Sequence, residues 1–193
     1  SSVSAAIVNT YSTLVPEALF DSKDPMQYLA FNFSLNGNFE TEIDSLPFFS
    51  VFNVSAFNKE WTAALKKKFG KIHIRHHSTV FLSSAFHQSL SRSEKILHIH
   101  LDEKSFILLL SEGKNLYFFN TFPFETPEDI AYYTLYICDL FNLNIEKTET
   151  ILSGKVDSGS PVFGILYKYI RNVKLADVFS HFLVFHVYKN GMH

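Results

Sequence analysis

Two histidines and an aspartate recur at every second position along one short apolar segment. His98, His100 and Asp102 lie at positions i, i+2 and i+4 of a stretch whose intervening residues are all Leu or Ile. Alternate residues of a strand lie roughly 6.5–7 Å apart, so two imidazoles placed in this way can share one metal ion. Ordinary hydrogen bonds are the commoner role of strand histidines, and both interpretations stay open. A metal would need a third ligand, for which the candidates are His76, His77 and His87.

A serine beside two histidines is the second arrangement that could do chemistry. Ser78 directly follows His76 and His77, and a histidine next to a serine can act as the base that activates its hydroxyl. No Gly-x-Ser-x-Gly elbow occurs, and residues 157–160 (Asp-Ser-Gly-Ser) have the composition of a turn and a helix cap. The sequence therefore contains no recognisable motif for serine catalysis, and a structural role for Ser78 is the simpler interpretation.

The composition excludes several classes of protein. The 193 residues are 47% hydrophobic and include 21 Phe, enough to bury a core without metals or disulfides. A net charge of −2 and a pI near 6.5 argue against a nucleic-acid binder, and Lys66, Lys67 and Lys68 are best explained as the solvated face of a helix. Cys138 is the only cysteine, so no intrachain disulfide can form, and its apolar surroundings predict a buried thiol.

The sequence also bears on location. It contains no run of 18 apolar residues, and its first residues lack the basic-then-apolar order of a signal peptide. We therefore expect a soluble, cytoplasmic protein with no membrane insertion and no nucleic-acid partner. Ser1 is not an initiator methionine, so we expect a further segment to precede it.

The second half alternates between strands and helices. The apolar runs that predict strands cover residues 95–101, 105–110, 116–124, 149–154, 173–178 and 181–188. Thr126 with Pro127, and Ser160 with Pro161, each predict the start of a helix. The residues expected on the buried face of the first helix are Ile130, Tyr133, Ile137, Leu140 and Phe141. The resulting β-β-β-α-β-α-β order is typical of a ribonuclease-H-like fold.

The first half is less regular. The segments predicted there are strands over 5–11, 48–54 and 72–74, a short helix over 16–20, and a helix or strand-helix pair over 78–88. A further helix begins after the cap residue Asn58 and ends at Gly70. The polar run 88–94 separates two apolar regions, so we predict an N-terminal lobe over 1–90 and a C-terminal lobe over 91–193.

Five segments carry a resemblance to a known family. They are residues 14–20 (LVPEALF), 76–78 (HHS), 126–129 (TPED), 152–154 (LSG) and 169–173 (YIRNV). In these segments the chain resembles an uncharacterised bacterial family, domain-of-unknown-function family 3822, which is assigned an actin-like ATPase fold. More remotely, it is similar to actin-like proteins of bacterial cell division and pilus assembly. The resemblance implies an α/β fold of two lobes, with a small α+β subdomain inserted at roughly residues 14–75, and a chain that starts partway into its first lobe.

The resemblance also implies where a nucleotide would bind. Actin-like ATPases hold phosphates on hairpins with the pattern Asp, any residue, Gly, because glycine lets phosphate oxygens reach backbone amides. Asp102 matches, but Lys104 replaces the glycine, and Glu103 would add negative charge beside the phosphates. Gly154 is a single glycine at the adenosine turn, where paired glycines are usual, and the equivalent hairpin of the first lobe is not recognisable. If Mg-ATP binds, the residues expected to line it are Asp102, Lys104, Ser105 and Gly154.

Asp102 also lies near the place of the catalytic aspartate in ribonuclease-H-like nucleases. Two-metal chemistry needs further carboxylates within a few Å. Glu128 and Asp129 open the helix that follows the third strand, but they are better explained as first-turn residues favoured by the helix dipole. Since the chain lacks a basic surface for a nucleic-acid backbone, a nuclease is the weaker interpretation.

Two functional hypotheses follow. The first is a non-catalytic actin-like scaffold or protein-interaction module with degenerate nucleotide-binding loops and no cofactor. The alternative is a nucleotide-binding ATPase or kinase-like protein that uses the cleft between the lobes. The first hypothesis predicts a protein partner or self-association through an aromatic patch. The candidates for this patch, which suit a buried core equally well, are Phe48, Phe49, Phe118 and Phe119.

Overall fold

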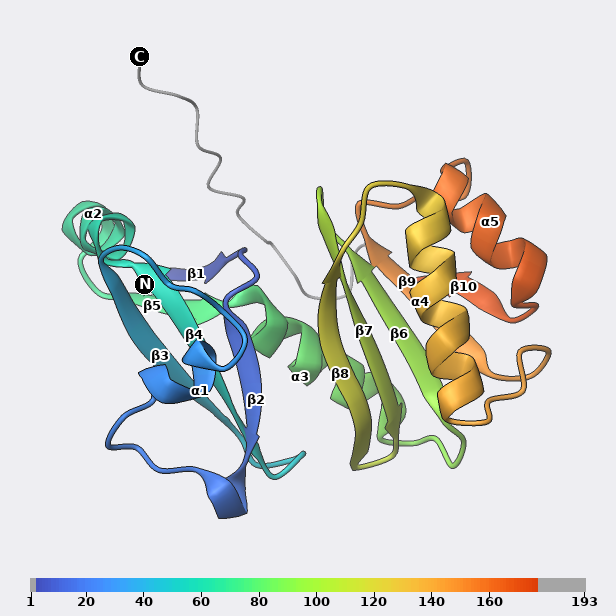
Figure 1. Ribbon diagram of the computed structural model, residues 1–193, viewed down its shortest axis with the longest axis horizontal. Coiled ribbons are helices and arrows are strands. Elements are labelled where there is room, and N and C mark those ends of the chain that lie inside the picture. The colour runs from blue at the N-terminus through green and yellow to red at the C-terminus, as the bar shows by residue number, and fades with distance from the viewer. Residues whose placement is uncertain (1–2, 177–193) are drawn as a thin grey trace. The chain divides into compact units, whose positions relative to one another are not determined.

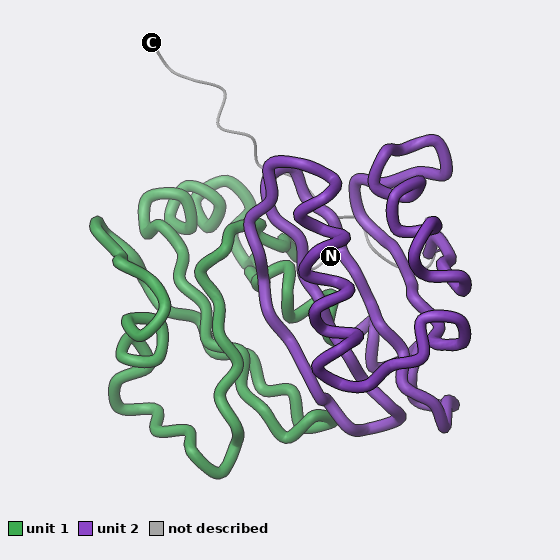
Figure 2. The backbone as a smooth tube through the Cα atoms, turned by 45° about the vertical axis from the view of Figure 1, so that its right-hand side comes forward, with its two compact units in different colours: residues 1–83, 182–193 green, residues 84–181 purple. Residues whose placement is uncertain are grey.

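The computed structural model describes residues 3–176, whose helices and strands are labelled in Figure 1. The strand predicted over 181–188, and the last residues of the one predicted over 173–178, lie outside this range. The chain divides between residues 83 and 84 into two compact units, coloured separately in Figure 2 and called unit 1 and unit 2 below. The division falls inside helix α3 (His77–Ser89), and the predicted boundary after residue 90 lies just beyond its end.

Unit 2 contains a five-stranded sheet with the order β10-β9-β6-β7-β8. Its strands are β6 (Ile96–Leu101), β7 (Ser105–Glu112), β8 (Asn115–Pro123), β9 (Glu149–Gly154) and β10 (Val173–Leu175). β6 to β8 form the antiparallel meander, and β6, β9 and β10 run parallel to one another. With α4 (Pro127–Leu140) and α5 (Pro161–Tyr169) between the strands, this confirms the predicted ribonuclease-H-like order.

Both helices of unit 2 begin as predicted. The Asp129 carboxylate accepts hydrogen bonds from the N–H groups of Glu125 and Thr126, at 2.9 and 2.8 Å, and these bonds hold the pKa of Asp129 below its usual range. The Ser160 hydroxyl accepts a 3.3 Å bond from the N–H of Phe163. The acidic first turn of α4 is therefore explained by helix capping.

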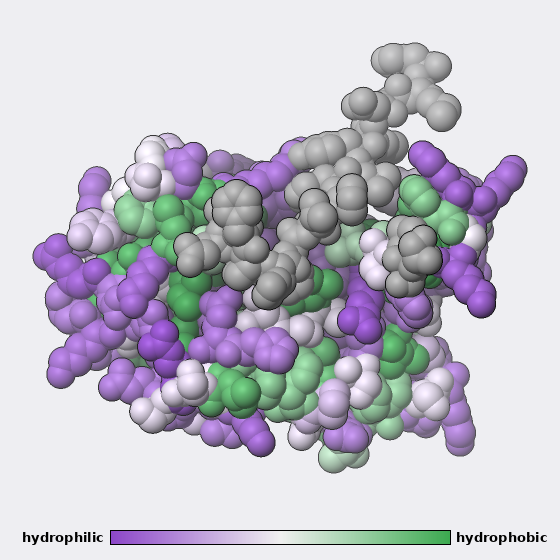
Figure 3. Space-filling model, turned by 180° about the vertical axis from the view of Figure 1, so that it is seen from behind, coloured by the Kyte–Doolittle hydropathy of each residue, from purple (hydrophilic) through white to green (hydrophobic). Residues whose placement is uncertain are grey.

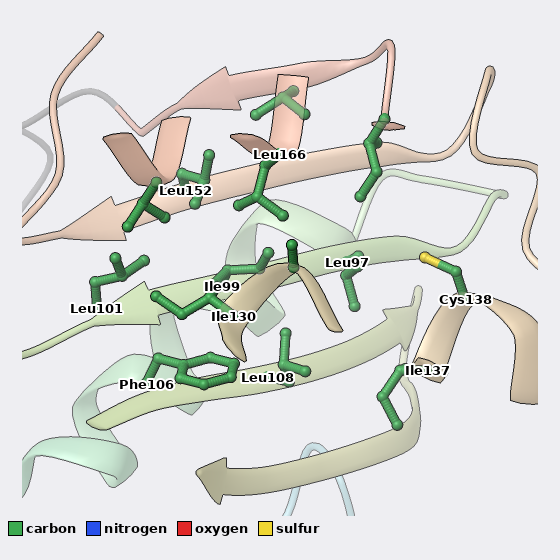
Figure 4. Packing of buried hydrophobic residues seen from close by; sticks show 14 of the residues in the cluster. Leu97, Ile99, Leu101, Phe106, Leu108, Ile130, Ile137, Cys138, Leu152 and Leu166 are labelled. Atoms are coloured by element: carbon green, nitrogen blue, oxygen red, sulfur yellow. The ribbon is translucent and has the colours of Figure 1, made fainter. Parts of the chain in front are cut away.

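The two helices cover one face of the sheet and bury its main core (Figures 1 and 4). Leu97, Ile99 and Leu101 of β6 pack in a cluster with Ile130 and Cys138 of α4. Burial raises the pKa of the Cys138 thiol to about 11, so the predicted buried thiol is confirmed.

One residue of the predicted helix face is misplaced. Leu140 is 54% exposed, whereas Ile130 and Ile137 are buried. At about 100° per residue, the buried arc of α4 is centred near Thr134, and position 140 falls on the opposite side of the helix.

Unit 1 combines a parallel strand pair with a small antiparallel sheet. β1 (Val3–Ile7) pairs with β5 (Ile72–His76). The antiparallel sheet has the order β2-β4-β3 and consists of β2 (Ser12–Pro16), β3 (Phe39–Leu46) and β4 (Val51–Asn58). The helical segments are a 3-10 turn (Glu17–Leu19), α1 (Met26–Ala30) and α2 (Lys59–Phe69).

The structure refines the predicted elements of unit 1. The strand predicted over 5–11 is correct only as far as Ile7, where β1 ends, because the chain turns at Asn9, whose carboxamide oxygen accepts the N–H of Tyr11 at 2.7 Å. β2, β3 and α1 were not predicted. α2 begins at the predicted cap, where the Asn58 carboxamide accepts the N–H of Glu60 at 2.9 Å, and ends at Gly70 with φ 67°. Thr62 is its buried residue, so Lys66 to Lys68 occupy a solvated face as predicted.

Within residues 3–176, no helix is both long enough and apolar enough to cross a bilayer.

Candidate functional site

The candidate nucleotide residues gather where two parallel strands of unit 2 end. β6 and β9 run in register, with Leu101 beside Gly154, so the turn that starts at Asp102 lies next to the turn that follows Gly154. In open α/β sheets, ligands bind outside the carboxyl ends of the parallel strands. The sequence therefore placed Asp102, Lys104 and Gly154 at the edge of the sheet where a ligand is expected.

Gly154 has a structural explanation of its own. Its φ is +85°, and a Cβ at this position would lie 2.0 Å from the carbonyl oxygen of Leu101. The next residue, Lys155, donates its N–H to the same carbonyl at 2.9 Å. Only glycine allows this approach of the two strand ends, so the strand packing requires Gly154 whether or not a nucleotide binds.

An ion pair joins the two turns. The Lys155 ammonium lies 2.6 Å from a carboxylate oxygen of Glu103. Sequence reasoning noted Glu103 but missed Lys155 as its partner. The signal was the parallel register, because strands that end side by side place the next residues of both turns within reach of each other.

Backbone groups of these turns are already engaged within the protein. The N–H of Asp102 donates to the carbonyl of Ser105 at 2.9 Å, and the N–H of Val156 donates to the carbonyl of Gly154 at 2.9 Å. The carbonyl of Lys104 accepts the N–H of Phe124 at 3.2 Å. Phosphate binding relies on backbone N–H groups that point at the ligand, and the amides of Asp102, Lys155 and Val156 donate elsewhere.

The two strand histidines differ in their surroundings. His98 is 2% exposed, and burial lowers its pKa to about 4, an effect that the charge of Glu149 only partly opposes. His100 is half-buried, and its Nδ1 lies 2.9 Å from the hydroxyl oxygen of Ser153 on β9. Among residues 3–176, no group of three or more His, Cys, Asp or Glu side chains could hold a metal ion. His87, the candidate third ligand within unit 2, therefore does not form such a group with this pair.

The serine and histidine noted in unit 1 do meet. The Ser78 hydroxyl oxygen lies 2.6 Å from Nδ1 of His76, whose Nε2 lies 3.0 Å from the carbonyl oxygen of Asn9. Burial, together with the neighbouring His77, holds the pKa of His76 well below its ordinary value, so the ring is neutral. Its Nε2–H then donates to Asn9, and Ser78 donates its hydroxyl proton to Nδ1.

This pair belongs to a buried polar network. Asn53 donates its amide group to the hydroxyl oxygens of Ser78 and Thr79, both at 2.8 Å, and Thr79 donates to a carboxylate oxygen of Asp44 at 2.7 Å. Asn53, Ser78 and His76 are at most 1% exposed. Because the Ser78 hydroxyl is surrounded by protein groups, a substrate carbonyl has no access to it, and the network is better explained as structural.

The predicted aromatic patch is not an exposed surface. Phe49 is buried, and Phe118 packs against the core of unit 2, with its ring 6.3 Å from that of Phe122 and 6.1 Å from that of Phe141. Phe48 and Phe119 are half-buried. Among residues 3–176, the most exposed large apolar residues are Phe31, Leu19, Tyr132, Tyr136, Leu140, Tyr167, Tyr169 and Leu90.

Two solved structures share this fold. A protein from Bacteroides thetaiotaomicron VPI-5482, described as having an actin-like ATPase fold and unknown function, superposes with a TM-score of 0.80 at 19% sequence identity, over 91% of this chain and 67% of its own. A chain of the PilM–PilN type IV pilus biogenesis complex superposes with a TM-score of 0.56 at 11% identity, over 91% of this chain and 69% of its own. These similarities confirm the predicted actin-like fold. No curated protein matches.

The family comparison agrees with the segments that suggested the resemblance. A family model described as "Protein of unknown function (DUF3822)" matches residues 1–173, which is most of the chain. The chain therefore belongs to the DUF3822 family, and it has an actin-like ATPase fold.

Proposed function

We propose that this protein is a non-catalytic actin-like scaffold, a protein-interaction module whose nucleotide-binding turns have degenerated. The observation that carries the proposal is the 2.6 Å ion pair between Glu103 and Lys155, which joins the two turns where a nucleotide would contact unit 2. A nucleotide would have to displace this pair or accommodate the Glu103 carboxylate next to its phosphates. The Glu103 carboxylate and the phosphates carry like charges and would repel one another.

Three further features support the same conclusion. Lys104 replaces the glycine that gives phosphates access to the hairpin backbone. The amides of Asp102, Lys155 and Val156 already donate to protein carbonyls. Gly154, the remaining glycine of the pattern, is required by the approach of β9 to β6. The hairpin glycine is thus replaced, three amides of the turns are engaged, and Gly154 is explained by packing.

A role in protein interaction is supported by the fold. The pilus biogenesis complex contains PilM together with PilN, so at least one protein of similar fold works within a protein complex. We infer a protein partner or self-association for this chain as well. We also infer a cytoplasmic location, which agrees with a single cysteine that is buried and free.

Isothermal titration of Mg-ATP and Mg-ADP into the intact protein tests the proposal. We expect no binding heat up to millimolar nucleotide, which corresponds to a Kd weaker than about 1 mM, or about −4 kcal/mol. The matched double variant is Glu103→Gln/Lys155→Gln, which removes the ion pair and both charges but keeps side chains of similar length.

Binding tighter than roughly 0.1 mM to the unchanged protein would overturn the proposal. If that binding were lost in Asp102→Ala, the protein would be a nucleotide-binding ATPase or kinase-like protein, which is the alternative function. Binding that occurs only in the double variant would support the proposal, because it would identify the ion pair as the group that closes the site.

A further inference from the structure

The side-chain oxygen of Asn53 is a buried acceptor to which the polar network of unit 1 supplies no donor. Hydrophilic side chains cover much of the surface in the view from behind, where solvent satisfies their polar groups (Figure 3). Asn53 is instead 0% exposed, and within residues 3–176 no group donates a hydrogen bond to its Oδ1. On folding, this oxygen exchanges the hydrogen bonds of bulk water for none, and folded proteins seldom leave a buried polar atom in that condition.

The orientation of the Asn53 amide is fixed from one end of the network by His76. Nε2 of His76 lies 3.0 Å from the carbonyl oxygen of Asn9 and 3.1 Å from its carboxamide oxygen. Both oxygens are acceptors, so Nε2 carries the proton of the neutral ring and Nδ1 accepts. Ser78 therefore donates its hydroxyl proton to Nδ1 at 2.6 Å, and it has only lone pairs left for Asn53.

The other end of the network gives the same orientation. Thr79 donates its hydroxyl proton to the carboxylate of Asp44 at 2.7 Å, because a carboxylate paired with Arg75 only accepts. The hydroxyls of Ser78 and Thr79 thus both turn lone pairs to Asn53 at 2.8 Å. Only the NH2 group of the amide can donate to both, and a flipped amide would break both bonds. Oδ1 is therefore the atom that needs a donor.

The surroundings of Oδ1 define the chemistry of that donor. It must bring an O–H or N–H proton, and it must be small, because Asn53 and Ser55, neighbours on one face of β4, are both 0% exposed. A metal cation fits less well. Among the described residues no group of three or more His, Cys, Asp or Glu could hold one, and the carboxylate of the network, Asp44, already pairs with Arg75.

We propose that unit 1 binds one ordered water molecule at Oδ1 of Asn53, as an integral part of the polar network where α3 begins. Buried waters typically make about three hydrogen bonds to groups that the protein leaves unsatisfied. Two candidates for the further bonds lie on the same face of the sheet. Asp44 is directly opposite Asn53 in the register of β3 with β4, and the Ser55 hydroxyl makes only a long bond, 3.5 Å, to the carbonyl of Glu42.

The water has a structural role that does not depend on the proposed function. Asn53 links β4 to the first turn of α3 through Ser78 and Thr79. A water bound at Oδ1 holds the other end of the amide and so keeps the NH2 group directed at both hydroxyls. Because the site is enclosed, the water exchanges with solvent only when unit 1 opens locally, and it stays bound for much longer than a surface water does.

Deuteron relaxation dispersion of the solvent tests this in solution, since it counts the water molecules that a protein holds for long times. We expect one long-lived water fewer in Asn53→Leu than in the unchanged protein, because leucine has a similar size and no oxygen. Asn36→Leu is the matched control, because it changes an exposed asparagine of unit 1, and it should leave the number unchanged. Fluorescence of Trp61 verifies that unit 1 of each variant is folded.

A high-resolution crystal structure of the unchanged protein tests the inference without any variant. We expect density for one water at about 2.7–3.0 Å from Oδ1 of Asn53, at the same position in crystals grown from different salts. The amide orientation is checked in the same density by its two hydroxyl partners, Ser78 and Thr79.

Three outcomes would overturn the inference. The first is a protein N–H or O–H group that donates to Oδ1 in the crystal, or no density beside it. The second is an equal number of long-lived waters in the unchanged protein and in folded Asn53→Leu. The third is a melting temperature that rises with potassium or magnesium chloride in the unchanged protein and in Asn36→Leu, but not in Asn53→Leu. That result would identify a cation at Oδ1 in place of water.

Discussion

Unit 1 and unit 2 are stabilised in different ways. In unit 2, five consecutive residues of β7, from Phe106 to Leu110, are all apolar and at most 1% exposed, so this strand is buried on both faces of the sheet. In unit 1, the residues where β5 ends and α3 begins are just as buried, but they include His76 and Ser78, which are held by Asn53 and Asn9 through hydrogen bonds.

The difference matters for how each unit responds to change. The free energy gained by apolar burial is roughly proportional to the area buried, so each truncated side chain of an apolar core removes only its own share of the stability. A buried polar network is satisfied only while all its members are present, and removing one leaves others without partners. We therefore expect unit 2 to be most sensitive where backbones touch, and unit 1 to be most sensitive at single hydroxyl and amide groups.

The chain supplies its own probe for each unit. Trp61 is the single tryptophan and lies in unit 1, so its fluorescence reports the unfolding of that unit. Cys138 is the single cysteine and is buried in unit 2, so the reactivity of its thiol reports the opening of that unit. If the two signals change at different denaturant concentrations, the two units do not unfold in a single transition.

The largest effect is expected at Gly154. Gly154→Ala places a Cβ 2.0 Å from the carbonyl oxygen of Leu101, at a φ of +85°. The ends of β6 and β9 must then separate, and we expect unit 2 to lose about 3 to 5 kcal/mol of stability. Urea unfolding followed by the reactivity of Cys138 measures this loss, and the Trp61 signal should shift less.

Gly70 is the matched control for that substitution. It also has a positive φ, +67°, but no atom lies within 4 Å of an added Cβ. Gly70→Ala should therefore cost only the backbone strain at φ 67° and ψ −112°, about 1 to 3 kcal/mol, and should act on unit 1. Equal losses for the two alanine variants would show that the contact with Leu101 is not what unit 2 requires.

A smaller loss of stability is expected in unit 2 when the pH is lowered. The folded-state pKa of His98, about 4, lies below the ordinary value of 6.5, so the unfolded chain takes up a proton at a higher pH than the folded one does. The stability contributed by the neutral His98 is complete above about pH 6.5 and is lost as the pH falls toward 4, by about 3 kcal/mol. Urea unfolding at several pH values, followed with dithiodipyridine on Cys138, measures the loss.

His98→Met should remove most of this pH dependence from unit 2. His87→Gln changes an exposed histidine of α3 and should leave the pH dependence of unit 2 unchanged. If His98→Met kept the full loss between pH 6.5 and 4, His98 would not be the group responsible.

The contrast between the apolar core of unit 2 and the less regular unit 1 also explains how much of the structure could be predicted from the sequence. In unit 2, continuous apolar runs and proline-capped helices predict every element in order, because β6 and β7 are buried on both faces and need apolar residues at nearly every position. In unit 1, β3 buries only Leu46, and α1 has five residues, so neither leaves a recognisable pattern.

The sites were predictable only where they depend on local sequence. The position of Asp102 at the end of a strand follows from the apolar run before it. The pairing of Glu103 with Lys155 joins residues 52 positions apart and depends on the register of β6 with β9, which the sequence does not encode locally. The same is true of Asn53, which approaches Ser78 and Thr79 only in the folded unit.

The smallest effect, and the most specific to unit 1, is expected at Ser78. Ser78→Ala removes a hydroxyl that donates to His76 and accepts from Asn53, and it leaves both groups buried without that partner. We expect unit 1 to lose about 2 kcal/mol of stability, which urea unfolding followed by Trp61 fluorescence measures. Ser45→Ala, at an exposed position of β3, should change it by less than about 0.5 kcal/mol. If the two alanine variants were equally stable, the polar network would contribute no more than surface residues do, and the two units would not differ in the way their cores suggest.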